Sequence, residues 1–594
     1  MKLYFVLVAC VFCLVTTKAE AGTINLSHDL VRLGIASENL APNSPSVDAR
    51  PLFQATLQYV KSHSTTLVTL DRGAYYFLTP QNQTAYLSFP ALSNLTVDLV
   101  GSTIYFAGAF LQGFFLGNCQ SVTLRNFKID FLNPPYTYVQ LAAVDSTART
   151  FTYKTLSGWP DPATLTAPTG VSVDLWAVAF RNHDIVPGTS RMHVAQPIAG
   201  NVLSLVQDNT PWTQSATLAT LQPDDTIAVT QRGGEPAVIV SRGDSIRISR
   251  ATIYGASQFA MLLNTVSNST VDHVYVIPRA GNLTSSNADG IHFIDSGPNN
   301  RIRNCYVTRT LDDALIIDSL DIATVPAATQ SEATQVTVNR TAFSRFPNGT
   351  SVNFVDPESD NEVNGATIIF QDPPDSNLPV FGGTVTLTLD QPLPALAAGS
   401  GMIFSSPSQR GAGSSIENNR VENILFGRGI WVGGSEGITI KDNNVGRTSN
   451  GGIVVYQGIV PYPVPPAHDI IIEHNLVDGS LGPMASGSGT QIALGGIMVD
   501  SVNESNVFVT SPPNTNISIQ FNTVLFSGRT GIWVGQLNGG TIRDNSIIGW
   551  DRYPNLPVFG VSRAEGAQLQ QDFTQPLVLL DNQNVGVSDN STFQ

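Results

Sequence analysis

The chain has 594 residues, of which 42% are hydrophobic, 8% are aromatic and only 13% are charged. Globular domains carry roughly 25% charged residues, so this composition excludes a disordered chain, a coiled coil and long exposed helices, which all need more charge. The net charge of −15 argues against nucleic acid and anionic membranes as partners, because both attract an excess of Lys and Arg. Neutral substrates are compatible with it.

The first segment of the chain, residues 1–21, has the pattern of a secretory signal peptide. Lys2 precedes an apolar run over residues 3–15, and the Ala-Glu-Ala at 19–21 supplies a small-x-small cleavage site. No later segment is apolar for long enough to cross a membrane. We therefore expect a secreted, extracellular glycoprotein whose mature chain begins at Gly22.

A repeat of two aliphatic residues separated by four mostly polar or small positions sets the expected architecture. Its shortest intervals are 23 residues (248 to 271) and 24 residues (416 to 440), and a second short run, often beginning Gly-Ile, follows each repeat. Units of this length cannot close a sheet alone, but they stack as coils of a parallel β-helix. The repeats begin at Leu124, Ile248, Val271, Ile302, Ile416, Ile440, Ile472, Ile519 and Ile542.

Five of these repeats have asparagine at the fourth position. Stacked coils would bring these side chains into a ladder of amide hydrogen bonds along the axis, a structural role. They are Asn419, Asn443, Asn475, Asn522 and Asn545.

Two intervals between repeats are much longer, 124 residues from Leu124 to Ile248 and 114 from Ile302 to Ile416. Alternating apolar and polar runs at 171–178 and 383–389 indicate antiparallel strands within them. The expected fold is all-β, a parallel β-helix with two small inserted antiparallel β modules. The expected boundaries are 1–21 for the signal peptide, 22–130 for the N-terminal coils, 131–244 for the first module, 245–325 for the coils with the candidate site, 326–410 for the second module and 411–594 for the C-terminal coils and tail.

Cleavage after residue 21 leaves Cys119 and Cys305 in the mature chain. At least one large insertion separates their coils, so we expect two buried free thiols rather than a disulfide. The fold then depends on burial and hydrogen bonds.

Acidic residues are scarce, yet three of them fall in register. Asp289 and Asp313 each precede the second strand of a coil and are 24 residues apart, one period, with Asp312 beside them. Carboxylates this close repel one another unless a cation binds or one of them keeps a proton. Glycosidic hydrolysis uses such a cluster, with one group as acid and another as base or nucleophile. The competing interpretation is that these residues cap turns, and their shared register favours the catalytic one.

Neighbouring coils supply candidate substrate-binding residues. Gln258 and Arg428 lie near the same edge one coil before and one coil after the aspartates. Trp431 could stack on a sugar, and His292 could orient a carboxylate or bind a hydroxyl group. Packing of Trp431 in the core and simple charge neutralisation by Arg428 are open alternatives.

These motifs resemble the pectin-lyase-like superfamily of right-handed β-helices and, within it, are similar to glycoside hydrolase family 110, the secreted α-1,3-galactosidases. The resemblance rests on Asn287-Ala-Asp289-Gly-Ile-His292-Phe293, the strand Ile302-Arg-Asn-Cys-Tyr306, Asp312-Asp313-Ala314-Leu315 and, less specifically, the segment Lys128-Ile-Asp130 to Tyr136 with Gln140. It implies a right-handed parallel β-helix and hydrolysis of a terminal α-linked galactose with inversion, without metal or cofactor. The catalytic trio implied is Asp289, Asp312 and Asp313, and Asp130 joins the substrate-binding set.

Within the trio we favour Asp312 as the general acid and Asp289 and Asp313 as the bases. The chain departs from the family pattern at Ile316 and Ile317, where the family has Asn and a polar residue. It also lacks the basic motif with which polygalacturonases bind an acidic substrate, so a neutral glycan is favoured. Two alternatives are a calcium-dependent polysaccharide lyase of the same fold and a non-catalytic extracellular glycan-binding or wall protein. The oligomeric state is open.

Overall fold

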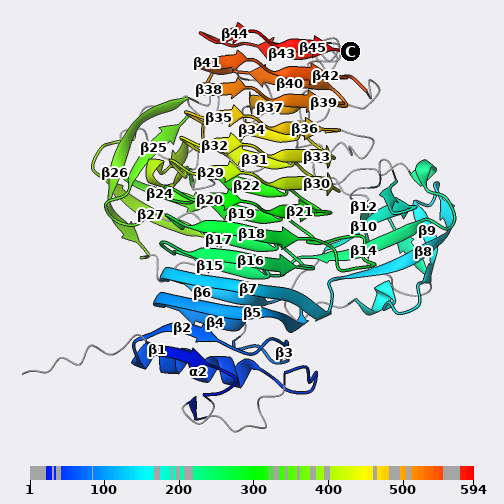
Figure 1. Cartoon of the computed structure of the whole chain (residues 1–594). Helices are drawn as coiled ribbons and strands as arrows, with labels where there is room; N and C mark the ends of the chain where they lie inside the picture. Colours follow the sequence, from blue (N-terminus) through cyan, green and yellow to red (C-terminus); the bar gives the residue numbers. More distant parts are fainter. Residues whose placement is uncertain are drawn as a thin grey trace, which may run out of the picture.

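A computed structural model shows a stack of parallel coils, with the N-terminal coils at one end and the C-terminus at the other (Figure 1). The structure describes residues 22–594 except 30–32, 35–41, 83, 166–173, 187–188, 190–191, 196–200, 207–217, 320–322, 326–333, 341–345, 357–360, 375–382, 394–401, 459–463, 481–494, 503–508, 510 and 553–574. The predicted signal peptide at 1–21 therefore lies outside the described residues. No helix among the described residues combines the length and the apolar character that a bilayer crossing requires.

One face of the stack is a parallel sheet with one strand from each coil. Its described strands are β4 (Ala85–Pro90), β6 (Gln112–Gly117), β15 (Val238–Ser241), β17 (Met261–Asn264), β19 (Ile291–Ile294), β22 (Leu315–Asp318), β31 (Ile430–Gly433), β34 (Ile453–Gly458), β37 (Gly495–Val502), β40 (Thr530–Gly535) and β43 (Leu577–Leu580). The Gly-Ile runs of the sequence fall in this sheet. The position before a strand requires a small residue, as at Gly429, where a Cβ would lie 2.2 Å from a methyl group of Val445.

A second, bent sheet completes each coil and contains the aliphatic repeats. Its described strands are β1 (Gly22–Asn25), β2 (Thr65–Thr69), β3 (Ala74–Phe77), β5 (Ser93–Gly108), β7 (Gln120–Asn133), β16 (Arg247–Ile253), β18 (Thr270–Val276), β20 (Arg301–Arg303), β21 (Tyr306–Thr308), β29 (Ser415–Glu417), β30 (Arg420–Ile424), β32 (Thr439–Lys441), β33 (Asn444–Thr448), β35 (Ile471–Glu473), β36 (Leu476–Asp478), β38 (Asn514–Gln520), β39 (Thr523–Leu525), β41 (Leu537–Arg543), β42 (Ser546–Ile548), β44 (Gly586–Ser588) and β45 (Ser591–Phe593). The first positions of all nine predicted repeats pair in register, from Leu124 with Ile248 to Ile519 with Ile542. The predicted parallel β-helix is therefore confirmed.

The predicted asparagine ladder is also confirmed. The Asn443 side-chain oxygen accepts hydrogen bonds from the backbone and amide nitrogens of Asn419, and its own amide donates to Asn475 at 2.9 Å. The ladder continues through Asn522 and Asn545 to a sixth member, Asn590. These bonds satisfy polar groups at a buried bend of each coil.

We expect Asn443→Ala to destabilise the protein, because it leaves two buried donors of Asn419 without an acceptor. Each such group costs about 1–3 kcal/mol, so thermal unfolding monitored by circular dichroism should show a clearly lowered midpoint. Asn444→Ala is the matched control, since Asn444 is exposed. Equal midpoints for the two variants would contradict a stabilising ladder.

Two antiparallel units project from opposite sides of the stack in Figure 1. The first is a sheet of β8 (Tyr136–Asp145), β9 (Thr150–Thr155), β10 (Asp174–Arg181), β11 (Asp184–Ile185), β12 (Met192–Val194), β13 (Val202–Ser204) and β14 (Thr226–Arg232). The second is a closed barrel of β23 (Ala323–Val325), β24 (Gln335–Arg340), β25 (Ser351–Val355), β26 (Glu362–Asp372), β27 (Thr384–Leu389) and β28 (Met402–Ser405). Each has its own apolar core.

The end of the first unit differs from the predicted boundary at 244. Strand β15 (Val238–Ser241) already belongs to the β-helix, where it pairs in parallel with β6 and β17. The sequence pattern did not predict this strand, because the residue before it is Ala237 rather than the glycine that precedes other strands of the sheet.

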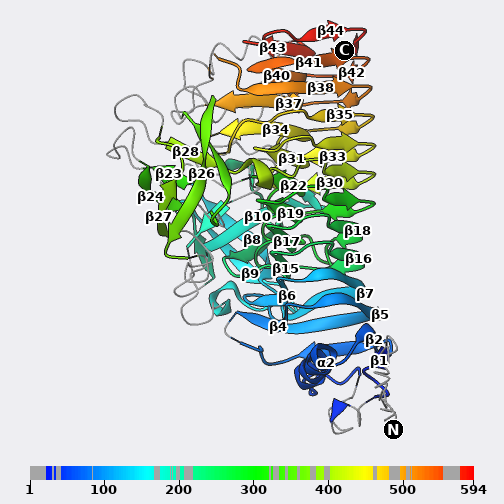
Figure 2. The ribbon, with the colours of Figure 1, turned by 90° about the vertical axis from the view of Figure 1, so that its left-hand side faces the viewer.

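A helix that the sequence did not suggest, α2 (Arg50–Ser62), lies at the N-terminal end of the stack (Figure 2). Leu52, Phe53 and Leu57 on this helix are buried in the apolar core enclosed by the coils of the β-helix, called the main core below. The ring centres of Phe53 and Phe77 lie 5.2 Å apart. The helix covers apolar surface that the first coils would otherwise expose, as terminal caps of solenoids do.

Both predicted thiols are free and buried. Burial raises the pKa of Cys305 to about 12. The fold therefore depends on packing and hydrogen bonds rather than on a disulfide between these residues.

Candidate active site

The backbone of two successive coils places Asp289 beside Asp313. Each residue comes one position before the small residue that opens a strand, Gly290 before β19 and Ala314 before β22. The nitrogen of Gly290 donates to the carbonyl oxygen of Asp313 at 2.9 Å, so the ladder between the coils includes the aspartates themselves. Only glycine fits at 290, because a Cβ there would lie 2.5 Å from the carbonyl oxygen of Ala314.

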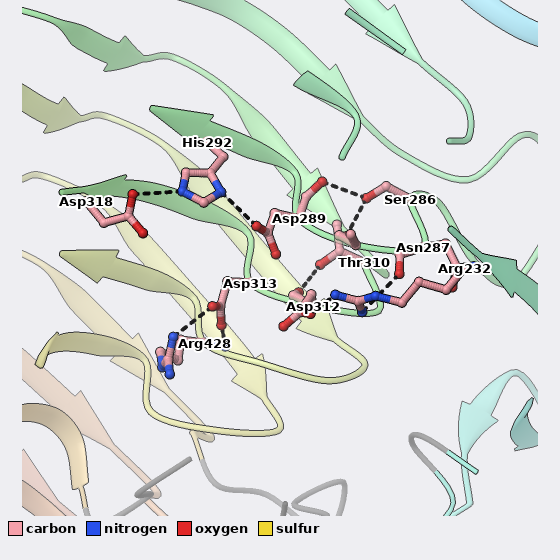
Figure 3. A network of polar contacts seen from close by, with 11 residues as sticks. Arg232, Ser286, Asn287, Asp289, His292, Thr310, Asp312, Asp313, Asp318 and Arg428 are labelled. Atoms are coloured by element: carbon pink, nitrogen blue, oxygen red, sulfur yellow. Dashed lines mark hydrogen bonds and ion pairs between the residues drawn. The ribbon is translucent and has the colours of Figure 1, made fainter. Parts of the chain in front are cut away.

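The structure brings Asp289, Asp312 and Asp313 into one cluster, the aspartate trio (Figure 3). One oxygen from each carboxyl group lies within 4.8 Å of the others. The three residues are only 6%, 8% and 3% exposed. Three carboxyl groups at this separation and burial cannot all ionise without compensation.

Each carboxyl group of the trio has a cationic partner. Arg232 donates to Asp312 at 2.6 Å, and Arg428 donates to Asp313 at 2.8 Å. The backbone nitrogen of Arg428 also donates to Asp313. His292 contacts Asp289 at 2.9 Å. Two guanidinium groups and one imidazole therefore face the three carboxyl groups.

The imidazole of His292 is held between two carboxylates from adjacent coils (Figure 3). Its Nδ1 lies 2.9 Å from Asp289 and its Nε2 lies 2.9 Å from Asp318, which is buried on β22. Burial by itself disfavours the imidazolium, but Asp318 and Asp289 together raise the pKa of His292 to about 10. The ring is thus cationic at neutral pH and donates to both carboxylates.

We expect Asp318→Asn to lower the pKa of His292, because one of its two anionic partners is removed. An opposite charge at this range shifts a pKa by about 1–3 units. NMR titration of histidine-labelled protein measures the change, with Asp272→Asn as a control, since Asp272 is buried and ion-paired on β18 but contacts His273 instead. An unchanged pKa of His292 would show that Asp318 does not stabilise the charged form of His292.

The trio retains a proton near neutral pH. Burial raises the pKa of Asp313 to about 7, although Arg428 lowers it, and Asp312 and Asp289 add to the rise. Burial also raises the pKa of Asp289, against the hydrogen bond from His292. Because the groups are coupled, the proton belongs to the cluster as a whole. A buried cluster with a retained proton suits acid and base chemistry on one substrate.

The other predicted substrate-binding residues differ in their surroundings. The side-chain oxygen of Gln258 is buried without a hydrogen-bond partner among the described residues. The guanidinium of Arg428 lies 4.2 Å from the ring centre of Trp431, which is only 8% exposed. This ring face is therefore occupied by Arg428. Asp130 lies outside the trio and pairs with Arg279 at 3.2 Å.

Sequence reasoning missed Arg232 and Asp318. Arg232 ends β14 of the first antiparallel sheet, and it also donates to the carbonyl oxygen of Asn287 at 3.3 Å. Nothing in a run of alternating strand residues marks it as a site residue. Asp318 had a usable signal, because a buried acidic residue ends a strand one coil beyond His292.

Among the described residues, the aspartate trio is the one group of three or more histidine, cysteine or acidic side chains whose geometry could hold a metal ion. A cation there would have to compete with Arg232, Arg428 and the charged His292 for the same oxygens. These three cationic side chains therefore disfavour binding of a divalent ion.

No protein-family model matches the sequence, and no curated protein matches it. Among solved structures, the chain is similar to the A-module of a mannuronan C-5 epimerase from Azotobacter vinelandii, at 9% identity over 96% of this chain and 97% of that one, with a TM-score of 0.38. It is also similar to the catalytic domain of a GH87 α-1,3-glucanase, at 8% identity over 93% and 67% of the two chains, with a TM-score of 0.43. An exopolygalacturonase from Thermotoga maritima matches at 9% identity over 96% and 91%, with a TM-score of 0.43. At such low identities and TM-scores, only the residues of the site itself can indicate function.

Proposed function

We propose that this protein is a secreted glycoside hydrolase that acts on a neutral glycan and releases terminal α-linked galactose. The observation that carries the proposal is the buried aspartate trio, which retains a proton near neutral pH and has a cation beside each carboxyl group. Glycosidic hydrolysis needs one protonated and one ionised carboxyl group at the scissile bond. Galactose as the sugar comes from the resemblance to glycoside hydrolase family 110.

The ion pairs favour a different assignment of roles from the one expected from the sequence. Asp312 pairs with Arg232 at 2.6 Å, and Asp312 is one of the groups that raise the pKa of Asp313. Asp313, with its pKa raised to about 7, is the better proton donor to the departing oxygen. We therefore assign Asp313 as the general acid and Asp312 and Asp289 as the bases that position water.

Inversion, which the resemblance implies, remains a prediction. Inverting enzymes separate their carboxyl groups by about 6.5–9.5 Å and retaining enzymes by about 5–5.5 Å. One oxygen from each carboxyl group of the trio lies within 4.8 Å of the others, a distance below both ranges, so the reaction product has to decide between them. Proton NMR of the first product anomer distinguishes the two outcomes.

The activity itself is tested with nitrophenyl glycosides and α-galactosyl oligosaccharides. We expect galactose release that a chelator leaves unchanged, because Arg232, Arg428 and His292 already contact the carboxyl oxygens that a metal ion would need. Loss of activity on chelation, with recovery on adding calcium and an unsaturated product, would instead select the lyase. Absence of turnover with retained glycan binding would select the non-catalytic alternative.

Secretion is part of the proposal and rests on the pattern of residues 1–21. Expression of the full sequence in a secreting host, followed by N-terminal sequencing of the protein in the medium, should give a chain that starts at Gly22.

A further inference from the structure

A pocket separate from the aspartate trio lies where the chain leaves the β-helix for the first antiparallel sheet. It has a volume of about 720 Å³ and is lined by residues from the end of β7, from the 3-10 helix at Pro162–Thr164, from β14 and from the segment after β18. Its volume falls in the range of about 300–1,000 Å³ typical of small-molecule sites. None of the trio residues lines it.

The pocket contains a polar group that lacks a partner. Gln231 is 2% exposed, and its amide nitrogen is buried without a hydrogen-bond partner among the described residues. An unsatisfied buried donor costs about 1–3 kcal/mol. A ligand with a hydroxyl or carbonyl oxygen in the pocket would satisfy this donor.

The charged groups of the pocket already neutralise each other. The Asp130 carboxylate is 8% exposed and lies 3.2 Å from the guanidinium of Arg279, whose side chain is 56% exposed. Both residues line the pocket. A phosphate or uronate would meet the Asp130 carboxylate, and a cation would meet Arg279. A neutral ligand with several hydroxyl groups can instead accept from Arg279 and donate to Asp130.

Aromatic side chains also line the pocket. Phe110 and Trp159 are half-buried at the pocket, and the indole packs against Tyr136 with ring centres 5.9 Å apart. Apolar faces beside a few fixed polar groups suit a sugar ring, which has both apolar C–H faces and hydroxyl edges. We propose that this pocket is a second carbohydrate-binding site for a neutral saccharide, a ligand class that rests on the proposed function.

This site and the trio lie on opposite faces of one strand. Gln231 and Arg232 are consecutive in β14, and successive side chains of a strand point to opposite faces. Arg232 contacts Asp312, whereas Gln231 lines the pocket. A saccharide bound here therefore does not contact the reacting carboxyl groups, and the site binds glycan without turnover.

The test uses isothermal titration of the full chain carrying Asp313→Asn with neutral oligosaccharides, including α-galactosyl ones. We expect Trp159→Ala and Gln231→Leu, added singly, each to weaken binding of the best oligosaccharide about tenfold, equivalent to about 1.4 kcal/mol. In the background with Asp313 intact, both variants should leave hydrolysis of a nitrophenyl glycoside unchanged. Trp550→Ala is the matched control, since Trp550 is a half-buried Trp that packs against the main core far along the chain.

The outcomes separate this proposal from the proposed function. Hydrolysis by the wild type together with unchanged saccharide binding in both pocket variants would overturn the second site alone. Saccharide binding that the pocket variants abolish, in a protein without turnover, would support the second site and overturn the hydrolase. Asn282 lines the pocket within an Asn-x-Thr triplet, and a glycan found on it by mass spectrometry would also overturn the proposal.

Discussion

Asp313→Asn and Asp312→Asn are each expected to lower kcat/KM for a hydrolysed glycoside by about 10²- to 10⁴-fold, the usual contribution of a general acid or base. The asparagine side chain keeps the shape of the carboxyl group and can still accept a hydrogen bond from Arg428 or Arg232. The variant chains should therefore fold, and the loss should appear in kcat. Initial rates on the best substrate of the glycoside panel measure it.

Asp272→Asn is the matched control for both variants. Asp272 is 5% exposed and ion-paired with Arg247, as the trio residues are with their own arginines, but it lies on the bent sheet. Its replacement should lower stability and leave kcat/KM unchanged. Near-wild-type rates in a folded Asp313→Asn or Asp312→Asn variant would exclude the trio as the catalytic group.

Arg428→Met is expected to move the alkaline limb of the pH profile upward. Activity requires the proton of the trio, so the rate falls as pH rises through the pKa of Asp313, which is raised to about 7. The Arg428 charge lowers that pKa, and its removal should raise it by about 1–3 units. The profile of kcat/KM between pH 5 and 10 shows the shift even if the variant binds substrate less tightly.

Arg420→Met provides the control, because Arg420 is an exposed arginine of β30 that pairs with Glu422 in the coil of Arg428. Its pH profile should match that of the wild type. An alkaline limb that stays in place, or moves to lower pH, in the Arg428 variant would show that the proton is not held by Asp313.

The repeat residues show how far sequence reasoning reached. Aliphatic residues such as Ile248, Val271 and Ile302 predicted both the coils and their register, because a core between stacked sheets requires apolar residues at equivalent positions of every coil. The same period predicted that Asp289 and Asp313 would be neighbours. Helix α2 escaped notice because it is not part of the repeat.

Asp318 and Arg232 show where sequence reasoning stopped. The contact of Asp318 with His292 depends on the directions of two buried side chains at different positions of adjacent strands. The contact of Arg232 with Asp312 joins residues 80 positions apart and depends on how the antiparallel sheet packs against the coils. A residue outside the repeat has no periodic partner, so its place is not encoded in a spacing.

The sequence by itself thus determined the β-helix, its register and the three carboxyl groups, since hydrogen bonds between coils and an apolar core allow one alignment of the repeat. Only the tertiary structure decided which cations face those groups and how far burial raises their pKa values. Those properties depend on burial and on contacts between segments distant in the sequence, and both arise only when the inserted sheet and the coils are packed together.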